Sequence, residues 1–313
     1  MKVFVAASLI ILVSSAQQCT QKWVCNEDSK DEKCYSSSIV EGVTTYKVKK
    51  CSTGTCDSTV TGLCVILKKL DGEKCSAPEE CYSGICKDSV CVGIAENESC
   101  SRIEECKKDL YCSFELNKVC KKYKKAGEEC FVGNECDFGL DCGSTTYQEA
   151  KKCVKMYSLK NGDYSDNKNL CETGYIYGTL ADSKCSSTSN VAKEGEACEA
   201  DTDCKIKIKT GETEVEANGK CTCSMIDLKS YCEYTTTSTK FQDYLTKAKS
   251  YFQGTSKSSD NIAVAKGETT EIKKAKYAAN IEYKDAPSCL IEYLTSSSWI
   301  QFTFMALISV LLF

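Results

Sequence analysis

The sequence contains no histidine, and none of its cysteines form a C-x-x-C pair. Without histidine, Ser-His and Cys-His nucleophile pairs, the H-E-x-x-H zinc motif and mixed Cys/His zinc sites are excluded. Without a C-x-x-C pair, the thioredoxin-type redox motif and the usual zinc-knuckle pair are also missing. The scattered aspartates and glutamates form no catalytic motif. We therefore expect a protein that is not an enzyme, with no catalytic residues, no metal site and no cofactor.

An excess of basic charge is also lacking. The 40 lysines and arginines are outnumbered by 44 aspartates and glutamates, which gives a net charge of −4. A nucleic-acid-binding domain usually carries a strongly basic surface. We therefore expect no nucleic acid partner.

The N-terminus has the layout of a secretory signal peptide. Met1 and Lys2 are followed by an apolar run over residues 3–13 and then by the small residues Ser14, Ser15 and Ala16. The run is shorter than the ~20 apolar residues that span a bilayer. We expect residues 1–16 to be removed on secretion.

The C-terminus predicts a GPI-attachment signal over residues 286–313. Its last part, "WIQFTFMALISVLLF", carries no charge and as a helix would reach about 22 Å, short of the ~30 Å hydrocarbon core. A polar spacer precedes it, and Asp285 or Ala286 is the expected attachment residue, with the tail removed. The alternative is a true single membrane span that extends back to Leu290. The anchor predicts a cell-surface protein on the outer leaflet of the plasma membrane.

Cysteine is abundant, with 26 residues, of which 25 lie between residues 17 and 285. This density is typical of a disulfide scaffold in a secreted protein, where the compartment is oxidising. We therefore expect the cysteines to be paired as structural disulfides.

The cysteine spacing repeats. Each of three repeats reads C-x5-C-x(4–5)-C-x(4–10)-C, and a "GE" opening recurs in "GEKC", "GEEC" and, later, "GEAC" at Cys198. Repeats of this size cannot each bury a core and need cross-links. Four cysteines allow three connectivities, which the spacing does not distinguish. The expected disulfide cysteines are Cys75, Cys81, Cys86 and Cys91; Cys100, Cys106, Cys112 and Cys120; Cys130, Cys136, Cys142 and Cys153; and, in a degenerate fourth segment, Cys198, Cys204, Cys221 and Cys223.

This spacing resembles the small cysteine-rich modules of the Dickkopf N-terminal and EB type, over roughly residues 72–232. Together with the signal peptide and the anchor signal, it resembles the cysteine-rich surface proteins of ciliates. The resemblance implies small disulfide-stapled modules at a cell surface.

We expect a fold of small disulfide-rich modules in tandem, built from short β-hairpins and loops and followed by a helical membrane-proximal segment. The chain divides into a signal peptide (1–16), an N-terminal cysteine-rich module (17–70), three repeats (71–153), a degenerate fourth segment with a hairpin (154–232), a cysteine-free helical stalk (233–285) and the removed anchor signal (286–313). Within 17–70, "TTYKVKKC" and "LCVILKKL" predict short strands.

The segment "KIKIKTGETEVEA" predicts a β-hairpin. Its apolar and charged residues alternate, and Gly211 followed by Glu212 is typical of a type II′ turn. That turn sets Lys209 opposite Glu214, Lys207 opposite Glu216, and Ile208 opposite Val215. We expect a charged face and an aliphatic face.

Two helices are expected in the cysteine-free segment. "TKFQDYLTKAKSYFQG" places Phe241, Tyr244, Leu245, Ala248 and Phe252 on one face, with a capping box from Thr239 to Gln242 and a stop at Gly254. The second is expected over residues 271–283. We expect both to pack against the modules, the alternative being a stalk or partner surface.

The expected function is that of a non-catalytic, GPI-anchored extracellular protein for coat formation, recognition or adhesion, with an extracellular protein or glycan as partner. The alternative functions are a secreted-type protease inhibitor or receptor-ligand module, and a single-span surface protein. Asn97, in the sequon Asn97-Glu98-Ser99, is the expected glycosylation site.

Parity links the cysteines to the anchor. If residues 286–313 are removed, Cys289 is lost and 25 cysteines remain. If each group pairs internally, the leftover cysteine belongs to the fourth segment, which holds seven. Such a cysteine usually pairs with another chain, so we expect a disulfide-linked homo-oligomer.

Overall fold

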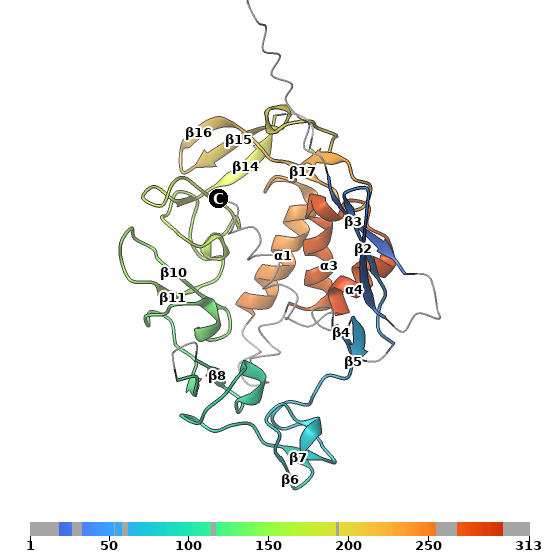
Figure 1. The fold of residues 1–313 in the computed structure, drawn as a ribbon. Coiled ribbons are helices and arrows are strands. Elements are labelled where there is room, and N and C mark those ends of the chain that lie inside the picture. Colours follow the sequence, from blue (N-terminus) through green and yellow to red (C-terminus); the bar gives the residue numbers. More distant parts are fainter. Residues whose placement is uncertain are drawn as a thin grey trace, which may run out of the picture.

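The computed structural model describes residues 19–26, 33–52, 54–57, 62–113, 117–191, 194–254 and 268–296. The predicted signal peptide and the apolar run 299–313 lie outside these residues. Figure 1 shows the helices α1 (Thr239–Gln253), α3 (Thr270–Ala278) and α4 (Ser288–Ser296) between the N-terminal strands on one side and the modules from the middle of the chain on the other. The predicted fold class, tandem disulfide modules with a helical segment after them, is confirmed.

In the part of the chain that the structure describes, five copies of one small module follow the N-terminal region. In each copy a single 3-10 turn precedes the second cysteine position, and a two-stranded antiparallel hairpin joins the third and fourth positions. The 3-10 turns are Pro78–Glu80, Ile103–Glu105, Gly133–Glu135, Lys168–Leu170 and Asp201–Asp203. The hairpins are β6 (Cys86–Lys87) with β7 (Val90–Cys91), β8 (Leu110–Cys112) with β9 (Cys120–Lys122), β10 (Leu140–Gly143) with β11 (Lys152–Lys155), β12 (Ile176–Tyr177) with β13 (Lys184–Cys185), and β17 (Cys221–Cys223) with β18 (Ser230–Cys232).

One disulfide connectivity recurs in these modules: the first cysteine pairs with the third, and the second with the fourth. The bonds are Cys75–Cys86 and Cys81–Cys91, Cys100–Cys112 and Cys106–Cys120, Cys130–Cys142 and Cys136–Cys153, and Cys198–Cys221 and Cys204–Cys232. Cross-links that close loops of this length restrict the unfolded chain, and one is worth ~3 kcal/mol in the chain-entropy model. They substitute for the large apolar core that a module this small cannot bury.

The predicted degenerate segment, residues 154–232, contains two of the five modules. The first keeps only the bond Cys171–Cys185. Ser165 and Ile176 occupy the places of the first and third cysteines, and Ser165 is completely buried. The second is the complete module of Cys198, Cys204, Cys221 and Cys232. Cys223, predicted to belong to that block, bonds elsewhere.

The "GE" motif has a physical cause. Its first residue adopts a left-handed backbone, as at Gly72 (φ 87°) and Gly127 (φ 86°), where glycine avoids a steric penalty. The acidic residue then accepts a hydrogen bond from a backbone N–H three residues earlier. In the first module, Leu70 donates in this way to Glu73 at 2.5 Å. The equivalent turns that read NE and GD have the same bond, from Ala95 to Glu98 at 3.1 Å and from Lys160 to Asp163 at 2.7 Å. The motif is therefore a turn that starts each module.

The N-terminal region forms a three-stranded sheet and a hairpin. β1 (Gln21–Cys25) pairs in parallel with β3 (Val43–Val48), which pairs antiparallel with β2 (Tyr35–Val40). β4 (Thr55–Asp57) pairs with β5 (Leu63–Val65). The expected strands around Tyr46 and Leu63 are confirmed. Two disulfides, Cys34–Cys56 and Cys51–Cys64, fasten the sheet to the hairpin.

The predicted hairpin is confirmed in its register. β15 (Lys205–Thr210) pairs with β16 (Thr213–Asn218), and the three predicted residue pairs lie opposite one another. Gly211 has φ 59°, as the first residue of a type II′ turn requires. β14 (Ser187–Asn190) adds a third strand on the other edge of β15. This strand was not predicted, because its sequence, STSN, has no apolar alternation.

Both predicted helices are present, with different ends. α1 (Thr239–Gln253) buries Leu245 and Ala248 on its predicted face, but its N-cap is Ser238, whose hydroxyl accepts from the Phe241 N–H at 3.1 Å. The capping box from Thr239 is therefore wrong by one residue. Gly254 ends α1 with an extended backbone (φ −65°). α3 (Thr270–Ala278) stops before a 3-10 turn at Ile281–Tyr283, so the second helix is shorter than predicted.

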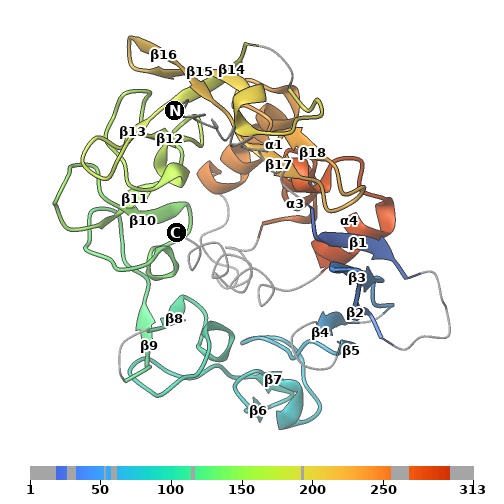
Figure 2. The ribbon, with the colours of Figure 1, turned by 45° about the horizontal axis from the view of Figure 1, so that its top comes forward.

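A third helix, α4 (Ser288–Ser296), packs beside β1 (Figure 2). Its buried residues Leu290, Tyr293 and Leu294 share the largest apolar cluster with Trp23 of β1 and Tyr277 of α3. The start and the end of the described chain therefore build one core together. Among the described residues, no helix is both long and apolar enough to cross a membrane.

The expectation that each cysteine group pairs internally is wrong. Cys19 bonds to Cys223, and Cys25 bonds to Cys289, while all 26 cysteines are paired within the chain. Cys19, just before β1, and Cys25, the last residue of β1, thus tie this strand to β17 and to α4. In the full chain no thiol is left for the predicted intermolecular bond, so the odd cysteine arises only if Cys289 is removed.

Candidate ligand-binding pocket

A cavity of about 340 Å³ lies where the third module, the fourth module and the helices meet. It is lined by β10, by the loop after β11, by the 3-10 turn of the fourth module, and by α1 and α3. Ligand pockets usually occupy 300–1,000 Å³ and form between packed units. This cavity has the size for one small ligand or one end of a larger one. The lining residues are Gly133, Asn134, Gly139, Leu140, Asp141, Met156, Tyr157, Asn169, Tyr244, Phe252, Glu268, Lys273 and Lys276.

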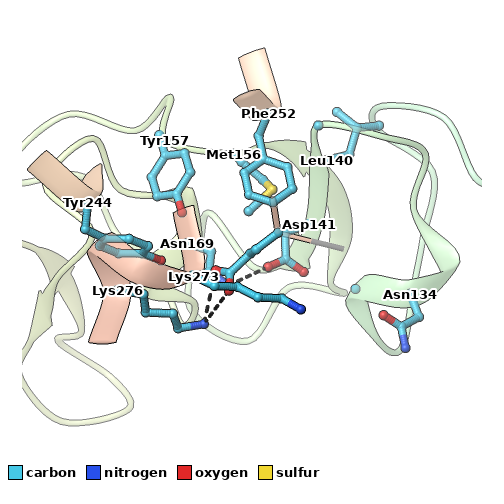
Figure 3. A pocket seen from close by; sticks show the side chains of 13 residues that line it. Asn134, Leu140, Asp141, Met156, Tyr157, Asn169, Tyr244, Phe252, Lys273 and Lys276 are labelled. Atoms are coloured by element: carbon cyan, nitrogen blue, oxygen red, sulfur yellow. Dashed lines mark hydrogen bonds and ion pairs between the residues drawn. The ribbon is translucent and has the colours of Figure 1, made fainter. Parts of the chain in front are cut away.

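One wall of the pocket is aromatic. Figure 3 shows the rings of Tyr157 and Phe252 on one side of the cavity and the charged ends of Asp141 and Lys276 on the other. Burial raises the pKa of Tyr157 to about 12, and burial also raises the pKa of Tyr244. Both phenols therefore stay protonated at neutral pH and act as neutral hydrogen-bonding groups.

Tyr157 is held in a strained backbone conformation. Its φ is 56°, in the left-handed region that bulky residues rarely adopt. Its N–H donates to the Asn169 carbonyl at 2.8 Å, and the Gln253 side chain of α1 donates to its carbonyl at 3.3 Å. Strain of this kind is worth about 1–3 kcal/mol and persists where the surroundings fix it, often at functional sites. The two modules and α1 thus fix this ring in place.

The opposite wall of the pocket is polar, and its side chains are hydrogen-bonded to one another and to the backbone. Asp141 of β10 accepts from the Asn169 side chain at 2.9 Å and from the Cys142 N–H at 2.8 Å. The bond from Asn169 connects the third module to the fourth. The carboxylate still has lone pairs that point to neither partner, since an ionised carboxylate has about four acceptor sites.

Charges along the lining balance. Glu268 accepts from Lys276 through both carboxylate oxygens at 3.1 Å. Lys273 donates to the Thr295 carbonyl at 3.4 Å, and burial lowers its pKa. Two acidic and two basic side chains leave the cavity without a strong net field, so its chemistry suits an uncharged, hydrogen-bonding ligand better than an ion.

α1 rests on two equivalent turns of neighbouring modules, and this contact forms the pocket. The third residue after the second cysteine position is left-handed at Gly84, Asp109, Gly139 and Gly174. A Cβ at Gly139 would lie 2.4 Å from the Phe252 carbonyl oxygen, and one at Gly174 would lie 3.4 Å from the Leu245 side chain. Glycine at position 139 therefore lets α1 approach the third module closely, whereas a Cβ at position 174 would make an ordinary contact.

The other sequence-predicted site residues lie away from the pocket. Asn97 is exposed in the starting turn of the second module, with φ 68°, in the place where other modules have glycine. Asp285 is exposed between the 3-10 turn Ile281–Tyr283 and α4, and Ala286 packs partly against the N-terminal core. The structure does not bring any of these three together with the cavity.

Five groups of three cysteine sulfurs lie within 4.8 Å of one another in the described residues. Each group is made of disulfide-bonded cysteines whose two bonds stack side by side in a module. A metal requires the thiolate form of cysteine. These sulfurs are therefore structural and offer no metal ligand while oxidised.

Only some of the residues that line this pocket could be identified from the sequence. The helical periodicity places Tyr244 and Phe252 on one apolar face of the predicted helix, and this face was expected to pack against the modules. Nothing in the sequence marks Asp141 or Tyr157, because their roles depend on contacts between modules. Searches against protein-family models, curated proteins and solved structures found no match for this chain. The function of the pocket is therefore inferred from its own geometry.

Proposed function

We propose that this chain is a non-catalytic, GPI-anchored extracellular surface protein that acts in recognition or adhesion. The observation that carries the proposal is the pocket, whose aromatic wall faces a charge-balanced polar wall across a rigid disulfide framework. The density of disulfides fits an oxidising extracellular setting. The cysteine spacing that resembles ciliate surface proteins and Dickkopf N-terminal or EB modules supports the same setting, with Asn97 as its glycosylation site.

The pocket favours a sugar residue as its ligand. A sugar ring has an apolar face that stacks on aromatic rings and hydroxyl groups that hydrogen-bond at its edge. Tyr157, Tyr244 and Phe252 supply the rings, and Asp141 and Asn169 supply the hydrogen-bonding edge. Because the lining charges balance, a neutral glycan fits better than a phosphate or a nucleotide. A glycan partner also fits a role at a cell surface.

The test is binding of the intact, detergent-solubilised protein to an array of neutral glycans. We expect at least one glycan to bind the native protein, with affinity reduced at least tenfold by Tyr244→Ala or by Asp141→Asn. Tyr147→Ala is the matched control, since Tyr147 is an exposed aromatic residue outside the pocket. Absence of any bound glycan, or equal losses in all three variants, would refute the proposed ligand.

The anchor is tested separately on intact cells. We expect the protein to be labelled by a membrane-impermeant reagent and to be released by a GPI-specific phospholipase. Labelling without release would indicate a membrane span, and absence of labelling would refute the surface location.

A further inference from the structure

α4 lies beyond the residues at which the sequence predicts anchor attachment, yet it is an integral part of the main core. Leu290 and Tyr293 are 0% and 1% exposed, and the Tyr293 ring lies 6.1 Å from the Trp23 ring. Removal of residues 286–313 would expose Trp23 and Tyr277 and leave a hollow between β1 and α3.

Four further contacts fasten α4 to separate parts of the fold. Cys289 bonds to Cys25 of β1. Lys50 pairs with Glu292 at 3.9 Å. Thr55 of β4 donates to the Ser296 carbonyl at 3.4 Å, and Lys273 of α3 donates to the Thr295 carbonyl at 3.4 Å. These contacts reach the last described residue of the helix, so the whole helix belongs to the folded body.

The predicted attachment residues are also poorly placed for cleavage. Asp285 lies between two packed elements, the buried Tyr283 on one side and α4 on the other. The Ala286 N–H donates to the Tyr283 carbonyl at 3.1 Å. A cut at this turn would separate from the protein the segment that carries Cys289, the partner of Cys25.

We infer that α4 and Cys289 are retained in the mature protein, and that its connection to the membrane lies beyond Ser296. The inference rests on the proposed membrane attachment through the C-terminal region and changes its position. Ser296 is followed in the sequence by Ser297 and Ser298 and then directly by the apolar run of residues 299–313. The Asp285 or Ala286 site would instead leave Cys25, a residue of the first strand, without its partner.

Counting free thiols tests this inference, because retention and removal of Cys289 predict different numbers of free thiols. The protein is purified from membranes without reductant and labelled with a maleimide in denaturant. If Cys289 is retained, the native protein has no free thiol and Cys25→Ser has one. If Cys289 is removed, the native protein has one free thiol, or an intermolecular bond at Cys25, and Cys25→Ser has none. The double variant Cys25→Ser, Cys289→Ser is the control and has none in either case.

Peptide mapping of the native protein gives the same answer without any variant. We expect the tryptic peptide WVCNEDSK (residues 23–30) to be cross-linked to a peptide that begins at Asp285. That result supports the inference whether the second peptide ends in a glycolipid or continues into the apolar run. Recovery of WVCNEDSK without this partner, together with a glycolipid on Asp285 or Ala286, would overturn it. Surface labelling is independent of both readouts, so failure of the inference can be told from failure of the proposed function.

Discussion

The contact between α1 and the third module can be tested by replacing one glycine. A Cβ at Gly139 would lie 2.4 Å from the Phe252 carbonyl oxygen, about 1 Å short of an ordinary contact. Gly84 has the same position in the first module and a similar φ, 69° against 77°, but no atom lies within 4 Å of its Cβ position. Gly84→Ala is therefore the matched control for Gly139→Ala.

Both variants place alanine in a left-handed conformation, which costs about 1–2 kcal/mol locally. In Gly139→Ala the end of α1 must also move. This movement disturbs the Gln253 hydrogen bond to the Met156 carbonyl (3.0 Å) and the edge contact between Phe138 and Tyr251 (5.5 Å between ring centres). A hydrogen bond and an aromatic pair are each worth about 0.5–1.5 kcal/mol. We therefore expect the free energy required to open α1 away from the modules to fall by about 2 kcal/mol.

Amide hydrogen exchange of residues 239–253 measures this difference, because the backbone cost at the alanine is the same whether α1 is docked or open. A loss of about 2 kcal/mol raises exchange through opening of α1 by about 30-fold. We expect that increase in Gly139→Ala and no change over these residues in Gly84→Ala. Equal exchange of α1 in the two variants would refute the docking of the helix on the third module.

Two further predictions concern the hairpin and the buried tyrosines. Gly211→Val should speed amide exchange in β15 and β16, because a β-branched residue resists the φ of 59°. Glu212→Val, the control, should leave exchange in these strands unchanged. Unchanged protection in Gly211→Val would argue against the turn. Burial raises the pKa of Tyr157 from 10.0 to about 12, so the folded state keeps a proton that the unfolded chain releases, and stability is full below pH 10 and falls between pH 10 and about 12. In an alkaline titration of the folded protein, phenolate absorbance should therefore rise at higher pH than in the unfolded chain, and the free energy of unfolding of Tyr157→Phe should depend less steeply on pH. Ionisation of all seventeen tyrosines near pH 10 with the fold intact would contradict this prediction.

Local patterns were sufficient to predict the elements whose stabilisation is local. The alternation in "KIKIKTGETEVEA" and one glycine defined a turn and a register, because a two-residue turn permits one alignment of its strands. The periodicity of residues 239–253 identified the buried face of α1, because packing requires apolar residues on one side of a helix. Cysteine spacing revealed the repeat, because every module closes its own loops.

The sequence pattern was less informative where two signals competed. Thr239 and Ser238 are both good caps, and the choice between them depends on which hydroxyl reaches the Phe241 N–H. The module with the single bond Cys171–Cys185 was not recognised as a repeat, because Ser165 and Ile176 replace the cysteines that define the pattern. Its shape is kept by the same turns and by packing against its neighbours.

Only the tertiary structure decided how the modules are joined. Cys25 and Cys289 are 264 positions apart in sequence, and nothing in their neighbourhoods indicates that β1 and α4 meet. The pocket has the same origin, since Asp141, Tyr157 and Tyr244 come from separate elements and become a site only when α1 docks on the modules. The sequence by itself determined the stapled repeats and the local elements, because these depend on composition and short-range spacing. The closure of the core and the candidate site depend on contacts between distant segments, which short-range patterns do not encode.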